Sequence, residues 1–150
     1  MKNLMLESLQ NILNRDLEKL ASELLLYPDE GSIWRIQESI KNPAGNLCLH
    51  LCGNLQYYIG TVLGKTNYTR DRDNEFAAKN IPRALLISEI GAAKKAIEDT
   101  LPTLTAEQLE SNYPIEVLGK PMTTLFFLIH LSSHLSYHLG QVNYHRRLLA

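Results

Sequence analysis

The sequence is poor in the features that mark several classes of protein. Its 15 basic and 16 acidic side chains leave a net charge of −1 at pH 7. A surface that binds nucleic acid carries an excess of Lys and Arg, so a chain this close to neutral has no electrostatic footprint for that partner. We therefore expect no nucleic acid among its partners.

Long hydrophobic runs and cysteines are also scarce. No run reaches the roughly 18 apolar residues that a membrane-spanning helix needs, and Met1-Lys2-Asn3 does not begin a signal peptide. We expect no membrane contact and a cytoplasmic location. In that reducing compartment the two cysteines, Cys48 and Cys52, are expected to be small core residues and not a disulfide.

What is present is typical of one globular domain. The chain has 150 residues, of which 45% are hydrophobic and 21% are charged. A domain of this size buries roughly 68–70% of its unfolded surface, which is enough for a real core. Because we find no internal repeat, low-complexity tract or break, we expect residues 1–150 to form a single domain.

Apolar residues recur at three- and four-residue steps in long stretches, which is the period of a helix with one buried face. We predict long helices over residues 4–26, 43–64, 81–101 and from 123 or 124 to 149. Asn42 is the expected N-cap of the second helix, with Pro43 at its first helical position. A short helix is predicted over 105–111 with Thr105 as N-cap, and an extended segment over 112–121. Four long helices in one domain indicate an all-α helical bundle.

Two glycines, Gly53 and Gly60, lie inside the second predicted helix. Glycine in a helix costs about 1 kcal/mol relative to alanine, so its presence needs a compensating reason. We expect a close crossing of helices at both positions.

Four of the five histidines lie in the last predicted helix. His130, His134 and His138 are four residues apart, so they lie along one ridge with neighbours about 5–6 Å apart at Cβ. Two imidazoles on adjacent turns and a third from a facing helix are typical of a catalytic metal site. His50 is the obvious third ligand, but spacing alone does not decide between the His130/His134 and His134/His138 pairs.

Residues 65–80 are polar and long for a connection in a compact bundle. They contain the run Arg70-Asp71-Arg72-Asp73, followed by Glu75-Phe76. We expect a solvated loop or a salt-bridged clamp over the mouth of the bundle; alternatively, the arginines of this run bind substrate.

Three stretches, NLCLHLCGNLQYYIG, TRDRDNEF and HLSSHLSYHLGQVNYHRR, resemble the DinB-like superfamily, in a subgroup of bacterial proteins. The motif is a histidine in the second helix with H-x-x-x-H-x-G-Q in the last, and the resemblance covers nearly the whole chain. It implies a four-helix bundle in up-down-down-up order, with a long crossover between the second and third helices. It also implies a divalent metal, zinc or nickel, held by three histidines, and a homodimer. Characterised relatives include a maleylpyruvate isomerase and transferases that use bacillithiol, mycothiol or glutathione.

Carried over residue by residue, the resemblance makes His50, His134 and His138 the metal ligands. Leu139-Gly140-Gln141 then matches the end of the family motif. His130 is expected one turn before the ligands, as a neighbour of the site or a proton shuttle. Gln141 and Asn54 are expected at the rim of the pocket.

The resulting functional hypothesis is a transferase that activates a low-molecular-weight thiol at the metal for attack on a small electrophilic substrate. Guanidinium groups suit bidentate contacts to carboxylates, so Arg70, Arg72 or Arg146 is expected to hold the carboxylates of the thiol. Two alternatives remain at this point. One is a non-catalytic metal-binding module of the stress response, and the other is a structural bundle whose histidines only pack.

Overall fold

The computed structural model describes residues 1–150, and all of its regular elements are helices. The long ones are α1 (Lys2–Leu26), α2 (Ala44–Leu55), α4 (Arg83–Thr100) and α6 (Thr124–Leu149). The last turns of α2 continue into a π-helical segment, η2 (Gln56–Thr61). Shorter helices are α3 (Arg72–Ala77), α5 (Ala106–Glu110), and the 3₁₀ turns η1 (Gly31–Trp34) and η3 (Leu101–Thr103).

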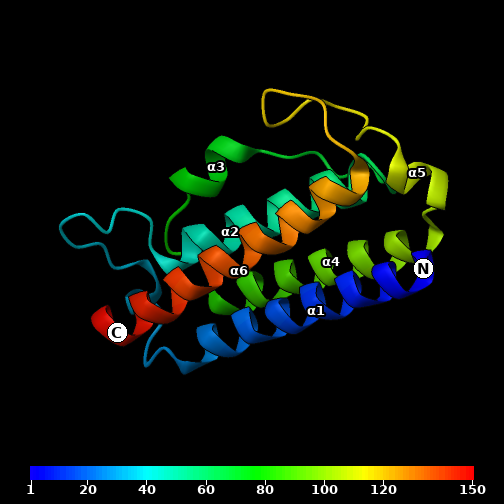
Figure 1. Cartoon of the computed structure of the whole chain (residues 1–150). Helices are drawn as coiled ribbons and strands as arrows, with labels where there is room; N and C mark the ends of the chain where they lie inside the picture. The colour runs from blue at the N-terminus through cyan, green and yellow to red at the C-terminus, as the bar shows by residue number, and fades with distance from the viewer.

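The four long helices pack side by side in a bundle (Figure 1). α1 contacts α4 and α6, and α2 contacts the same two helices. The chain runs one way along α1 and α6 and the other way along α2 and α4, so the segment that carries α3 returns along the outside of α2 before α4 begins (Figure 1). The all-α bundle is therefore confirmed, and α2 and α6 are neighbours within it. None of the helices combines the length and the apolar character of a membrane span.

The core is made by the apolar stripes of these helices. In α1, leucines at three- and four-residue steps are completely buried: Leu13, Leu17, Leu20 and Leu24. In α6 the corresponding stripe is Leu128, Leu131, Leu135 and Val142. Each such side chain contributes about 1.5–3 kcal/mol through burial, which is why the predicted periodicity becomes a bundle.

Several predicted helix ends are confirmed by their caps. The Thr105 side chain accepts a hydrogen bond from the backbone N–H of Gln108, whose side chain accepts one from the backbone N–H of Thr105. Thr123 caps α6 by accepting from the N–H of Phe126. The cap of α2 was predicted wrongly by one residue, because Pro43 is the N-cap and Ala44 the first helical residue.

Two other predictions need correction. The second helix does not stay α-helical to residue 64: it becomes π-helical at Gln56, and Gly60 lies in that segment. A Cβ on Gly60 would lie 3.2 Å from the Cβ of Ala96 on α4, so the expected close crossing is present there. Residues 65–80 are not all loop, since they contain α3. The side chain of Asp71 caps the N-terminus of α3 by accepting a hydrogen bond from the backbone N–H of Asn74.

Candidate metal centre

Three histidines from two neighbouring helices meet on one side of the bundle. His50 lies on α2, and His134 and His138 lie on α6. One ring nitrogen of each lies within 4.8 Å of the others, and the Nε2 atoms of His50 and His134 are 3.2 Å apart. Zn–N bonds of about 2.0–2.1 Å place tetrahedral donors roughly 3.4 Å apart, so the three imidazoles fit a divalent metal.

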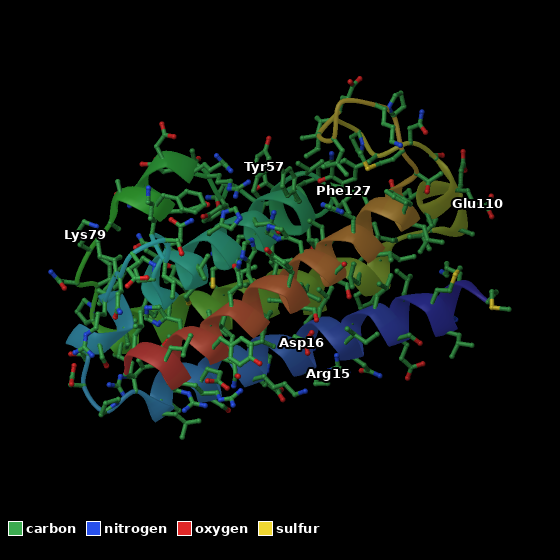
Figure 2. The ribbon with its side chains drawn as sticks, turned by 60° about the vertical axis from the view of Figure 1, so that its left-hand side comes forward. Arg15, Asp16, Tyr57, Lys79, Glu110 and Phe127 are labelled. Carbon is green, nitrogen blue, oxygen red and sulfur yellow. The ribbon has the colours of Figure 1, made fainter.

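The local sequence explains why these nitrogens converge. The four-residue step in α6 places His134 and His138 on consecutive turns, with ring centroids 4.6 Å apart. α2 packs against α6, and His50 is one of its buried residues. Figure 2 labels Tyr57, in the segment that follows α2, and Phe127, on α6, and so locates the two helices that carry the histidines.

His50 is oriented by a carboxylate from α3. Its Nδ1–H donates to Oε1 of Glu75 at 3.1 Å, which leaves the Nε2 lone pair directed at the other histidines. Arg70 holds the same carboxylate with two hydrogen bonds, from Nε to Oε2 at 2.9 Å and from Nη2 to Oε1 at 3.0 Å. Burial alone would raise the pKa of Glu75, but the hydrogen bonds from His50 and Arg70 outweigh it and lower that pKa. The Glu75 carboxylate is therefore ionised at neutral pH.

Gly53 provides the room for this carboxylate. A Cβ built on Gly53 would overlap Oε2 of Glu75. A close crossing of helices was expected here, and the group that approaches Gly53 is the side-chain carboxylate of Glu75 on the short helix α3, which packs on α2.

His138 is oriented from within its own helix. Its Nδ1–H donates to Oε1 of Gln141, three residues later, at 2.7 Å. The Nε2 lone pair of His138 is then free to bind an ion. Gln141 was expected at the rim of the pocket, and it lies in direct contact with His138.

The environment favours the neutral form of His134 and His138. Burial, reinforced by His138 and His50, lowers the pKa of His134 to about 4. Burial also lowers the pKa of His138, against the hydrogen bond to Gln141. Because a metal binds neutral imidazole, both rings are in the required state at pH 7.

The remaining α6 histidines lie outside this triad. His130 is stacked between Phe127 and His134, with ring centroids 5.9 and 6.4 Å away. His145 is buried elsewhere, with its Nε2 bonded to the backbone carbonyl of Arg35 and its Nδ1 to the hydroxyl of Tyr27. Of the two pairs that the spacing left open, the structure brings His134 and His138 together with His50.

A cavity of about 240 Å³ opens beside the histidines. Its polar lining includes His130 and Asn54, and the amide oxygen of Asn54 is buried without a hydrogen-bond partner. The wall opposite the bundle comes from the segment before α6, at Val117 and Leu118. The apolar part of the bundle wall is formed by Phe127, Leu131 and the ring of Tyr58.

The three candidate substrate-binding arginines have different surroundings. Arg70 lines the cavity, but its guanidinium is engaged by Glu75. Arg72 also lines the cavity; it makes no ion pair and lies over the ring of Phe76, 5.3 Å from its centroid. Arg146 lies outside the cavity and pairs with Glu23 of α1 at 2.6 Å.

The contact of Glu75 with His50 is the feature of this centre that sequence reasoning missed. It occurs in a polar stretch without periodicity, so nothing in the local pattern distinguishes it from the exposed acids Asp71 and Asp73. The one available signal was Gly53, three residues after His50 and thus on nearly the same side of α2.

Another cavity, of about 700 Å³, lies along the C-terminal half of α6 and residues 39–42. Gln141 lines it, and none of the three clustered histidines does. The histidine centre is therefore served by the smaller cavity.

Comparison with known proteins places the chain in a family. A family model described as "Protein of unknown function (DUF1572)" matches residues 3–150. Searches of curated proteins and of solved structures found no match. Because the family model covers nearly the whole chain, the protein belongs to the DUF1572 family.

Proposed function

We propose that this protein is a DinB-like enzyme that binds zinc or nickel through His50, His134 and His138 and activates a small thiol there. The observation that carries the proposal is the convergence of three imidazole nitrogens within 4.8 Å, beside a cavity of about 240 Å³. The course of the chain in Figure 1 supports the up-down-down-up order, with its long crossover before α4, that the superfamily resemblance implies.

Each residue has a defined role in this reaction. A divalent metal on three imidazoles keeps one position open and lowers the pKa of a thiol bound there. His50, His134 and His138 would supply the nitrogen donors to that metal. A thiol bound there would release its proton to solvent, and its sulfur would form a bond to the electrophilic carbon of the substrate as the leaving group departs with its bonding electrons.

The first experiment is elemental analysis of the purified, untagged protein beside His134→Ala and His130→Ala. We expect about one zinc or nickel per chain in the wild type and in His130→Ala, and none in His134→Ala. The reason is that His134 belongs to the triad and His130 does not. His130 is the matched control since it lies one turn earlier on α6. Absence of metal from the wild type, even after incubation with zinc and nickel, would remove the enzyme hypothesis.

Arg72 is the arginine that we propose holds a carboxylate of the thiol. It faces the cavity without an ion-pair partner, whereas Arg70 is committed to Glu75 and Arg146 to Glu23. Arg72→Ala should raise KM for the thiol about tenfold or more, consistent with loss of a charged hydrogen bond worth about 1.5–3 kcal/mol, and leave metal content unchanged. Arg146→Ala is the control and should keep the wild-type KM. Equal KM values for all three proteins would contradict this role.

One observation favours a second candidate, a non-catalytic metal-binding module of the stress response. The cavity of about 240 Å³ is smaller than the roughly 300–1,000 Å³ of most ligand pockets. Turnover by the metal-loaded protein with a thiol and an electrophile decides between the two. Product formation that His134→Ala abolishes supports the transferase, and stable metal without any turnover supports the module.

We also propose that the protein is a cytoplasmic homodimer that uses the outer face of α6. Five large side chains there are more than half exposed: Phe126, Ile129, Tyr137, Tyr144 and Leu148. At about 100° per residue they lie within an arc of roughly 100°, on the side away from the core stripe. Gly140 lies in the same arc, and a Cβ added to it would meet nothing within 4 Å. No other helix carries as many large hydrophobic side chains that are more than half exposed as this exposed α6 stripe does. The free, buried thiols of Cys48 and Cys52 suit a reducing compartment.

A further inference from the structure

We infer that Glu75 is a positioning residue for His50 and that the docking of α3 is coupled to metal binding. The inference rests on the proposed function, because it requires that His50 be a ligand. It goes further because it assigns a role to α3 and the chain around it. In this arrangement the segment from Arg70 to Ala78 fastens onto the bundle through the metal centre.

The side-chain contacts that α3 makes with the bundle are concentrated on α2. The Glu75 carboxylate bonds His50, and the Phe76 ring lies 4.8 Å from the His50 ring between centroids. Asn46, one turn before His50, donates from Nδ2 to the backbone carbonyls of Glu75 at 3.0 Å and Ala78 at 2.8 Å. The helix that carries the ligand is therefore also the surface that holds α3.

The Glu75 carboxylate is an anion with 6% side-chain exposure, so it depends on its charged neighbours. Arg70, with 10% side-chain exposure, supplies one of them. When His50 binds a cation through Nε2, its Nδ1–H becomes more acidic and donates more strongly to Glu75. Metal thus strengthens the contact that docks α3, and by linkage a docked α3 strengthens metal binding by the same factor.

Gly53 leaves the space that the Glu75 carboxylate needs beside α2. The carboxylate occupies the space that a Cβ would need, so Gly53→Ala must displace Glu75. Gly91 provides a matched control because it is also a helical glycine, and a Cβ added there would meet nothing within 4 Å. Asp73 provides the second control, since it is an exposed acid on the same short helix.

The test measures zinc affinity by competition with a chromophoric chelator in the full-length protein. We expect Glu75→Gln and Gly53→Ala each to weaken zinc binding about 10–100-fold, as loss of a ligand-orienting carboxylate does. Asp73→Asn and Gly91→Ala should bind zinc as the wild type does. Zinc binding by wild type and Glu75→Gln within twofold of each other overturns the inference and leaves the proposed function intact. Failure of the wild type itself to bind zinc overturns the proposed function.

The coupling has a separate readout in trypsin cleavage after Arg70, Arg72 and Lys79. Zinc should slow cleavage at these sites in the wild type about tenfold and should protect Glu75→Gln much less. Equal protection of the two proteins, or no protection of the wild type at a zinc concentration that saturates it, shows that α3 docks independently of the metal. Circular dichroism of metal-free Glu75→Gln that matches the wild type shows that the bundle is intact, so that a loss of affinity reports on the site.

Discussion

His145 shows what a histidine outside the triad does in this bundle. Its Nδ1 lies 2.7 Å from the hydroxyl of Tyr27 at the end of α1, and its Nε2 lies 2.8 Å from the carbonyl of Arg35. A neutral ring that donates from Nε2 and accepts at Nδ1 satisfies both partners. The ring thus joins α1, α6 and the connection after η1.

This neutral state predicts a pH dependence of stability. Burial lowers the pKa of His145 below its ordinary value of about 6.5. Between pH 6.5 and the lowered pKa, the unfolded chain binds more protons than the folded one, so the free energy of unfolding falls as pH falls through that window. Urea denaturation of the metal-free protein at a series of pH values should show this slope. His145→Gln should show a smaller slope, and an unchanged slope would contradict the assignment.

At the scale of elements, α6 depends on a well-formed start. Thr123 accepts a hydrogen bond from the N–H of Phe126 and so satisfies one of the free donors of the first turn. Thr123→Ala should lower the free energy of unfolding by about 1 kcal/mol, measured by urea denaturation. Thr123→Ser keeps the hydroxyl and is expected to stay within about 0.5 kcal/mol of the wild type. If both variants lost the same free energy of unfolding, the stabilisation would come from the methyl group of Thr123 and not from the capping hydroxyl.

The elements that could be predicted from sequence are those that carry their own pattern. The apolar stripes of α1, α4 and α6 repeat over many turns, and Thr105 and Thr123 have local capping signals. α3 has only 6 residues and no apolar stripe. It is held instead by contacts to residues of α2 that are distant from it in sequence. Local periodicity cannot report such contacts, which is why no helix was predicted in residues 65–80, only a solvated loop, a salt-bridged clamp or substrate-binding arginines.

The candidate site also contains some features that could be predicted from sequence and others that could not. Four-residue spacing brings histidines together on α6, and the family resemblance points to His50, His134 and His138. The ionic partners of arginines depend on tertiary structure, so charge type alone could not separate Arg72 from the paired Arg70 and Arg146. Glu75 was missed for the same reason.

At the scale of the whole molecule, the exposed apolar stripe of α6, which runs from Phe126 to Leu148, predicts that the protein is a dimer. Light scattering should give the mass of a dimer for the wild type. Ile129→Glu and Tyr144→Glu should each shift the protein toward monomer, because a charge would then be buried at the interface. Leu85→Glu is the control, since Leu85 is equally exposed but lies on α4. A monomeric wild type, or dimers of unchanged stability in all three variants, would exclude this face as the interface.

The centre is also assembled from distant parts of the chain, since His50 and His134 are 84 positions apart. Ribosomes add about 5–20 residues per second, so roughly 4–17 s separate the synthesis of these two residues. During that time the nascent chain holds one histidine of the triad, and the helix that carries the other two does not yet exist. The three-histidine group that could hold a metal is thus complete only after translation has passed residue 138, and a product truncated before α6 lacks two of its three histidines.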